Sequence, residues 1–153
     1  MKQLKVDAIK DGTVIDHIPA GKAIQVLKIL KTQGNHPVSI GMNLPSTKFG
    51  AKDILKIENH ELSAAEVDRI AIIAPTASIT IIRHYEVAEK RKVSVPEKLE
   101  NVAYCPNPNC ITNAESIATR FKKYKENADG KVDYMCNYCE KIYRAEDFKI
   151  KLG

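Results

Sequence analysis

The stretch AYCPNPNC (103–110), together with YMCNYC (134–139), contains all four cysteines of the chain. Each stretch holds a close pair, with four residues between Cys105 and Cys110 and two between Cys136 and Cys139. Two such turns, joined by a long insert, can bring four thiolates into the tetrahedral arrangement that Zn²⁺ prefers. Proline and asparagine in CPNPNC favour the tight turn that directs both sulfurs to one point. We therefore predict one structural Zn²⁺ per chain, bound by these four cysteines without an open coordination position.

Disulfide bonds and a redox dithiol are the alternatives to a metal. The segment CNYC (136–139) has the spacing of a redox motif, but it lacks the βαβ context of such motifs. The segment MKQLKVDAIKDG (1–12) has no apolar core of a signal peptide, and no apolar run approaches the roughly 18 residues of a membrane helix. We therefore expect a cytoplasmic protein that does not enter a membrane, and in that reducing compartment metal is favoured over disulfides.

The first hundred residues show regular periodicity. The expected elements are a strand at 3–9 (QLKVDAI), a helix that begins at Pro19 and stops at Gly34, strands at 38–44 (VSIGMNL) and 53–58 (DILKIE), a helix that begins with the Ser63–Glu66 capping box and ends at Pro75, and a strand at 77–87 (ASITIIRHYEV). This order is the ferredoxin-like βαββαβ pattern, an antiparallel sheet with both helices on one face. The fold class is therefore α+β, and the other face of the sheet is open.

The periodicity breaks at EKRKVSVPEKLENV (89–102), which is charged and contains Pro96. We predict a nucleotide-binding domain at 1–92, a linker at 93–100 and a small β-rich, zinc-ribbon-like domain at 101–153. A domain of about 50 residues builds only a small core, and such domains commonly need a metal. The cysteines lie in this part of the chain.

The net charge of +5 fits an anionic partner but identifies none. Residues 101–153 hold nine Lys and Arg against seven Asp and Glu, and four thiolates with Zn²⁺ add −2 to that balance. The metallated domain is then near neutral, which argues against a binder of the phosphate backbone. RFKKYK (120–125) is a local basic patch that we interpret as a solvated strand or loop. A zinc-ribbon nucleic-acid-binding regulator is the alternative function.

The strand at 53–58 has two chemically different faces. Lys52, Lys56 and Glu58 share one parity, while Leu55 and Ile57 share the other. If the apolar pair packs under the helices, the two lysines lie on the open face, four residues apart, which is about 14 Å at about 7 Å for every two residues. Two ammonium groups at that spacing can bind a polyphosphate or a ribose. Exposed lysines also serve solubility alone, so both interpretations stay open.

TVIDHIPA (13–20) supplies two further candidates. Asp16 can accept hydrogen bonds from ribose hydroxyls, and His17 can donate to a phosphate at the start of the first helix. Alternatively Asp16 is a turn residue and His17 a packed loop residue. A third possibility is a small enzyme that uses Asp16, His17 and Lys56. The sequence contains no nucleophile with an adjacent base and no glycine-rich phosphate loop, so catalysis has little support.

Four segments, VDAIKDGTVIDHIPAG (6–21), IGMNLPS (40–46), KDILKIEN (52–59) and CPNPNC with CNYC, together resemble the regulatory chains of aspartate carbamoyltransferase. The resemblance covers essentially the whole chain. It implies a non-catalytic allosteric subunit of pyrimidine biosynthesis, whose regulatory homodimers tie catalytic trimers together through the zinc domain. It also implies that CTP, often with UTP, inhibits the enzyme and that ATP activates it from the same site. IGMNLPS would border the regulatory dimer interface.

The resemblance assigns roles to residues of the first domain. The backbone of Ala8 and Ile9 would contact the base, Asp16 and Lys56 the ribose, and His17 and Lys90 the phosphates, with Lys52, Glu58, Tyr85 and Val87 completing the pocket and Val14, Ile54 and Ile82 as apolar walls. Thr80 departs from the family, in which an asparagine is expected near the triphosphate or base. Threonine keeps a hydroxyl but lacks the amide, so effector preference is expected to differ.

Overall fold

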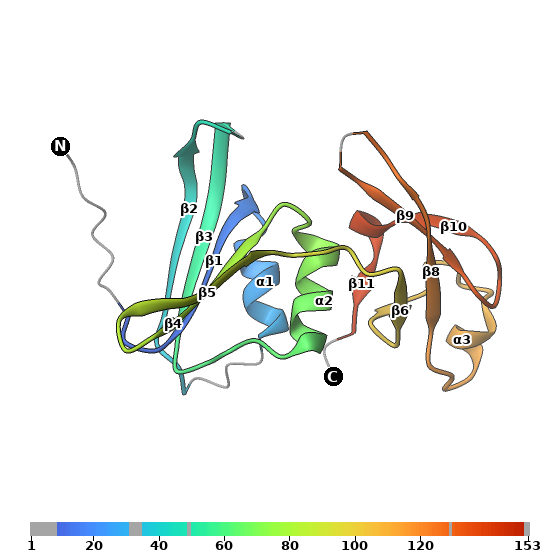
Figure 1. The fold of residues 1–153 in the computed structure, drawn as a ribbon. Helices are drawn as coiled ribbons and strands as arrows, with labels where there is room; N and C mark the ends of the chain where they lie inside the picture. Colours follow the sequence, from blue (N-terminus) through green and yellow to red (C-terminus); the bar gives the residue numbers. More distant parts are fainter. Residues whose placement is uncertain (1–8, 31–34, 49, 129, 152–153) are drawn as a thin grey trace. The chain divides into compact units, whose positions relative to one another are not determined.

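The computed structural model describes residues 9–30, 35–48, 50–128 and 130–151 (Figure 1). The chain divides into two compact units. The first contains the residues up to Ser63 together with Thr76–Lys92, and the second contains Ala64–Pro75 together with the residues from Val93 onward. No helix among the described residues is long and apolar enough to cross a membrane.

Each unit combines strands with short helices. Unit 1 contains β1 (Gly12–Pro19), α1 (Ala23–Ile29), β2 (Val38–Ser46), β3 (Gly50–Glu58), β4 (Ser78–Arg83) and β5 (Glu86–Lys92). Unit 2 contains α2 (Ala64–Ile73), β6 (Lys98–Glu100), β7 (Ala103–Tyr104), α3 (Ile111–Ala114), β8 (Arg120–Glu126), β9 (Val132–Cys136), β10 (Ile142–Arg144), the 3₁₀ turn η1 (Ala145–Asp147) and β11 (Lys149–Ile150).

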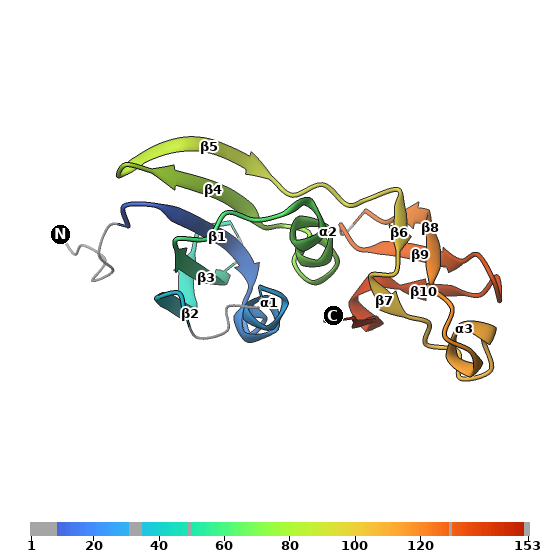
Figure 2. The ribbon, with the colours of Figure 1, turned by 90° about the horizontal axis from the view of Figure 1, so that it is seen from below.

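Unit 1 is a five-stranded antiparallel sheet with the strand order β2-β3-β1-β4-β5. Its first four strands have the ferredoxin-like order, and β5 adds one strand at the edge. Ile15, Leu55 and Ile57 are fully buried, as are Val26 and, almost fully, Ile29 of α1. Helix α1 lies against one face of this sheet (Figure 2). The predicted α+β class and the predicted parity of residues 52–58 are therefore confirmed.

The first strand among the described residues is β1, which covers Gly12–Pro19. The strand predicted at 3–9 falls almost entirely outside the described residues, as does Gly34. Asp16 and His17 therefore lie within a strand, and Pro19 ends that strand and does not begin the helix, which starts at Ala23. The register of β1 shifts between Ile15 and Ile18, and the extra residue of this bulge interrupts the alternation that would have revealed the strand.

The strand predicted at 77–87 is two strands. β4 ends at Arg83 and β5 begins at Glu86, and the two residues between them, His84 and Tyr85, have positive φ angles of 53° and 67°. Positive φ at both central residues is the geometry of a tight hairpin turn that normally favours asparagine and glycine. Every residue of β5 is exposed, which explains why residues 89–92 show no apolar alternation in the sequence.

Unit 2 is built around one apolar core. A four-stranded sheet of order β10-β9-β8-β6 and a two-stranded sheet β11-β7 enclose it. Phe121, Tyr134 and Phe148 form its aromatic centre, with 4.6 Å between the ring centroids of Phe121 and Phe148, and Ile72 of α2 belongs to the same cluster. The sequence-based division into 1–92, 93–100 and 101–153 stays a prediction, although Leu99 is buried and β6 pairs with β8.

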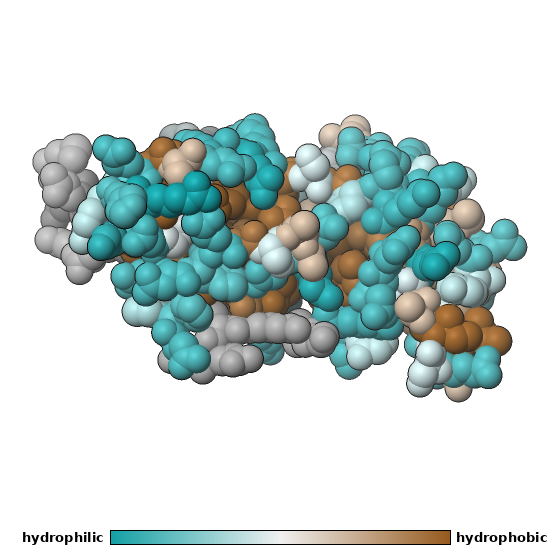
Figure 3. Space-filling model, turned by 60° about the horizontal axis from the view of Figure 1, so that its bottom comes forward, coloured by the Kyte–Doolittle hydropathy of each residue, from teal (hydrophilic) through white to brown (hydrophobic). Residues whose placement is uncertain are grey.

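Most of the visible surface is hydrophilic (Figure 3). RFKKYK occupies β8, where Phe121 is buried while Arg120, Lys122 and Lys125 are exposed, so this patch is a solvated strand, as predicted. An apolar group lies at the end of unit 2 that carries α3, where the side chain of Ile111 is 47% exposed.

Candidate functional site

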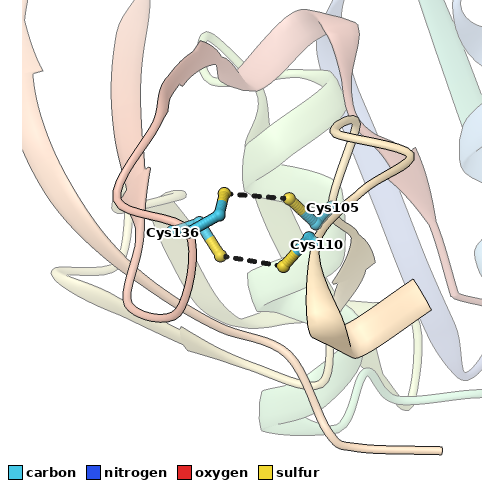
Figure 4. Close-up of side chains that lie close together, drawn as sticks. Cys105, Cys110 and Cys136 are labelled. Carbon is cyan, nitrogen blue, oxygen red and sulfur yellow. Dashed lines mark hydrogen bonds between the residues drawn. The ribbon is translucent and has the colours of Figure 1, made fainter. Parts of the chain in front are cut away.

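The four cysteines form one cluster in unit 2. Their sulfur atoms all lie within 4.8 Å of one another. The Cys105 and Cys139 sulfurs are 3.8 Å apart, as are those of Cys110 and Cys136 (Figure 4). Metal–sulfur bonds of about 2.3 Å in a tetrahedron give sulfur–sulfur edges of about 3.8 Å. The arrangement therefore fits one metal ion bound by four thiolates.

The first pair, Cys105 and Cys110, lies at the two ends of the CPNPNC loop (105–110). Backbone N–H of Cys110 donates to the carbonyl of Asn107 (3.0 Å), and N–H of Asn109 donates to the Asn107 side chain (3.0 Å). The Asn113 amide donates to the carbonyls of Cys105 (2.9 Å) and Asn107 (2.7 Å). These bonds close the tight turn predicted from the asparagines, and they hold Cys105 and Cys110 at its two ends.

The second pair lies in a turn between β9 and β10. N–H of Glu140 donates to the carbonyl of Cys136 (2.9 Å), and Glu140 has a positive φ of 61°. Cys105, Cys110 and Cys136 are buried and Cys139 is half-buried. All four ligand positions are supplied by the chain, so the site has the closed form of structural metal centres.

The electrostatics of the cluster suit a cation. Burial raises the pKa of the Cys105 and Cys136 thiols, so a positive ion is needed to stabilise four thiolates together. Burial also acts on Cys110, but hydrogen bonds from the hydroxyl and the N–H of Thr112 outweigh it and bring the pKa of Cys110 to about 7. The Thr112 hydroxyl donates to the Cys110 sulfur at 3.2 Å.

A second candidate site is the face of the unit 1 sheet that does not carry the buried residues. One cross-strand row runs through four strands, because Lys56 of β3 pairs with Val14 of β1, Val14 with Thr80 of β4, and Thr80 with Lys90 of β5. Residues directly opposite on antiparallel strands project from the same face. The register therefore aligns four of the predicted residues in one line across this face.

A neighbouring row extends the face toward the turns. Glu58, Gly12, Ile82 and Val87 are paired in that order across β3, β1, β4 and β5. A methyl group placed on Gly12 would lie 3.1 Å from the Ile9 side chain, so Ile9 is near this row. Ala8 lies outside the described residues. Tyr85 and Val87 are strongly exposed, at 66% and 61%.

The bulge of β1 forms the opposite end of the face. The Lys52 ammonium is 2.8 Å from the Asp16 carboxylate, which also accepts the N–H of His17 (2.6 Å). Burial acts to raise the pKa of Asp16, but the Lys52 and His17 contacts bring this pKa below its ordinary value. His17 Nδ1 is 3.0 Å from the Ser78 hydroxyl, and Thr76 donates to the carbonyl of His17 (2.8 Å).

Sequence reasoning missed three residues that shape this end. Thr76, just before β4, and Ser78, the first residue of β4, contact His17, and Asp53 is a fully buried carboxylate on β3. Asp53 has the parity of Leu55 and Ile57, and a charged residue among core positions is a signal that could have found it. The remaining predicted residue, Ile54, lies between Lys52 and Lys56 on β3 and has the same parity as these two lysines.

Comparisons with known proteins identify the family of both halves of the chain. Residues 4–94 match the family model described as the allosteric domain of the aspartate carbamoyltransferase regulatory chain, and residues 97–149 match the one described as its metal binding domain.

Relatives with the name aspartate carbamoyltransferase regulatory chain align over nearly their full length. The chain is 48% identical over 155 residues to that of Pyrococcus horikoshii, covering 99% of this chain and 100% of the relative. It is 48% identical to those of Korarchaeum cryptofilum (95% and 94% covered) and Methanocaldococcus jannaschii (93% and 93%). The two matched domains are regulatory and metal-binding, not catalytic. The chain therefore belongs to the family of aspartate carbamoyltransferase regulatory chains.

Proposed function

We propose that this chain is the allosteric subunit that places aspartate carbamoyltransferase of pyrimidine biosynthesis under nucleotide control. CTP, with UTP, inhibits the enzyme, and ATP activates it, in competition for the open sheet face of unit 1. The metal domain, with Zn²⁺ in its four-cysteine site, contacts the catalytic chain and ties catalytic trimers together, while two regulatory chains form a homodimer. The observation that carries the proposal is the row Lys56–Val14–Thr80–Lys90.

The dimensions and charges of the face suit a nucleoside triphosphate. Three inter-strand spacings of about 4.8 Å separate the backbones of Lys56 and Lys90, roughly 14 Å in all, which is comparable to the length of an extended nucleotide. Lys52, Lys56 and Lys90 supply the positive charge that a polyphosphate requires. Asp16, near Lys52, can accept from ribose hydroxyls, and Val14 gives the sugar or base an apolar surface.

Competition at one site explains opposite effects. CTP and ATP share ribose and triphosphate and differ in the base, so each can shift the enzyme only through unequal affinity for its low- and high-activity states. Thr80 lies between Val14 and Lys90 in the row. Its hydroxyl offers one donor, whereas an asparagine amide offers two donors and a carbonyl acceptor, so we expect weaker discrimination between bases here.

Zn²⁺ is the metal that best matches the cysteine cluster. Structural zinc sites of the four-cysteine type have four thiolates and no open ligand position. Here the described cysteines supply four sulfurs, and two sulfur–sulfur distances are 3.8 Å. Elemental analysis of the purified chain should give one zinc per chain. The metal then supplies folding free energy to a domain whose own core is small.

Nucleotide binding is tested by calorimetry on the full zinc-loaded chain. CTP and ATP should each bind one site per chain and displace one another. Lys56→Ala or Lys90→Ala should weaken binding by at least about tenfold, because each removes a charge-assisted contact. Arg91→Ala is the matched control, since Arg91 is the exposed neighbour of Lys90 but has the opposite parity on β5. Absence of binding at millimolar CTP and ATP would refute the effector assignment.

Assembly is tested by mixing the chain with an aspartate carbamoyltransferase catalytic trimer. Sizing should show one larger complex, and CTP should change the dependence of its activity on aspartate. The chain alone should show no turnover. If it binds DNA or RNA with an affinity that falls steeply with salt, and no trimer, the nucleic-acid alternative is favoured.

A further inference from the structure

Among the described residues of unit 1, Asp53 has the most deeply buried charged group, and the proposed nucleotide contacts do not use it. Its side chain is 0% exposed and lies in β3 between two residues of the site, Lys52 and Ile54. A buried carboxylate is costly unless it is well hydrogen-bonded. Among the described residues no lysine, arginine or histidine forms an ion pair with it. The hydrogen bonds that Asp53 accepts therefore indicate its role.

Three backbone N–H groups donate to this carboxylate from two separate segments. Oδ2 accepts from Gly21 (2.9 Å) and Ala23 (3.0 Å), which lie between β1 and the first turn of α1. Oδ1 accepts from Asn43 (2.9 Å), which has a positive φ of 55° in the bulge of β2. One side chain thus fixes the exit of β1 and the bulge of β2.

The chain leaves β1 after Pro19, two residues beyond His17. Asp16 and His17 together oppose Ile54, because the register passes from Ile15 opposite Leu55 to Ile18 opposite Asp53. His17 has a positive φ of 58°, a conformation that is costly for a non-glycine residue unless its surroundings enforce it. Ser78 at the start of β4 and Thr76 just before it contact His17, and the hydrogen bonds to Asp53 hold the segment that follows the bulge.

We propose that Asp53 is a positioning residue for the phosphate-binding end of the sheet face. It rests on the proposed function above, in which His17 meets phosphates and Asp16 the ribose. By anchoring Gly21 and Ala23, Asp53 keeps His17 in the conformation that presents its side chain to the phosphates, whereas Asp16 is held separately by its ion pair with Lys52. It does not itself touch the nucleotide. The base-binding end, near Gly12 and Val87, lies several residues along β1 and is independent of it.

This role predicts a difference between ligands that a purely structural role does not. Loss of Asp53 should weaken CTP, which reaches the phosphate end, and spare cytidine, which has no phosphate. A mutation that merely destabilises the unit lowers the folded fraction and affects both ligands alike. Asp53→Asn keeps one carbonyl oxygen for Gly21 and Ala23, so it should retain part of the CTP affinity that Asp53→Ala loses.

The experiment titrates CTP and cytidine into the full zinc-loaded chain, followed by NMR. In Asp53→Ala the CTP dissociation constant should rise roughly tenfold, the size of one charge-assisted contact, while that of cytidine stays within about twofold. Asp53→Asn should fall between the wild type and Asp53→Ala. Between the wild type and Asp53→Ala, the amide signals of residues 16–23 should shift and those of residues 85–87 should not.

Thr13→Val is the matched control. Thr13 is also fully buried on β1, and its hydroxyl donates to the His60 carbonyl (2.6 Å) away from the bulge. It should lower stability and leave the ratio of CTP to cytidine affinity unchanged. An unchanged ratio in both Asp53 variants, or an equal change in Thr13→Val, would overturn the positioning role. If the wild-type chain binds neither ligand, the proposed function itself fails. If Asp53→Ala does not fold, Asp53→Asn decides.

Discussion

Replacing Gly12 by alanine tests the backbone that carries the proposed site. Gly12 lies in the central strand, paired with Glu58 on one side and Ile82 on the other. Its φ of 148° lies in a region that side chains rarely adopt. An alanine Cβ would also lie 2.2 Å from the carbonyl oxygen of Ile57, a backbone atom that cannot rotate away.

The expected cost has two parts. The unfavourable φ contributes about 1–3 kcal/mol. Relief of the overlap requires β1 and β3 to separate by roughly 1 Å, which weakens neighbouring ladder hydrogen bonds worth about 1 kcal/mol each. We therefore expect Gly12→Ala to lower the free energy of unfolding of unit 1 by about 4 kcal/mol. Gly50→Ala is the control, because Gly50 also begins a strand with a positive φ (77°) but has nothing within 4 Å of the added methyl group, so about 1 kcal/mol is expected.

Native-state hydrogen exchange is the suitable assay, because a chain of two units need not unfold in one step. The slowest amides of β1 and β3 report the free energy of opening of unit 1, and those of β8 and β9 serve as an internal reference in unit 2. The reasoning is refuted if Gly12→Ala and Gly50→Ala lower protection equally, or if Gly12→Ala leaves the amides of β1 and β3 unchanged.

Three further predictions follow from single contacts. Because the pKa of Asp16 is lowered, its ion pair with Lys52 stabilises the fold fully above the ordinary pKa of 3.8, and this stabilisation is lost as the pH falls through the lowered pKa. The difference in unfolding free energy between wild type and Asp16→Asn should be below about 1 kcal/mol at neutral pH and should vanish in acid. Tyr134→Phe removes a buried hydroxyl that donates to the Pro96 carbonyl (2.6 Å), and denaturation should show a loss of about 1–2 kcal/mol that the exposed control Tyr124→Phe does not. A strong chelator should release the metal and abolish amide protection in β8 and β9 while β1 and β3 stay protected; retained protection throughout unit 2 after complete metal removal would contradict a structural metal.

The features that the sequence predicted well are those that depend on residue type and spacing alone. Four cysteines in two close pairs are typical of a metal site, and the structure brings all four sulfurs together. The parity of Lys52 and Lys56 against Leu55 and Ile57 needed only the two-residue period of a strand. The row across four strands was not predictable in this way, because strand pairing and register are properties of the folded sheet.

The features that the sequence concealed are irregularities of the backbone. The bulge adds one residue to β1, so Ile15 and Ile18 are both buried although three positions separate them. The hairpin turn uses His84 and Tyr85, where sequence rules look for asparagine or glycine. In both places tertiary contacts override local preference, and both lie at the edges of the proposed nucleotide site.

In each unit, irregular segments meet at one cluster of polar or metal-binding atoms. In unit 2, four sulfurs converge on one point and draw together the ends of β7, α3 and β9. In unit 1, the Asp53 carboxylate draws together the exit of β1 and the bulge of β2 through three backbone N–H groups. The first centre is evident from sequence because cysteine is rare and its spacing is diagnostic. The second is concealed because aspartate is common, and only its parity with Leu55 and Ile57 shows that its charge is buried. In this strand, a charged residue at a core position marks the point at which two irregular segments are hydrogen-bonded to the sheet.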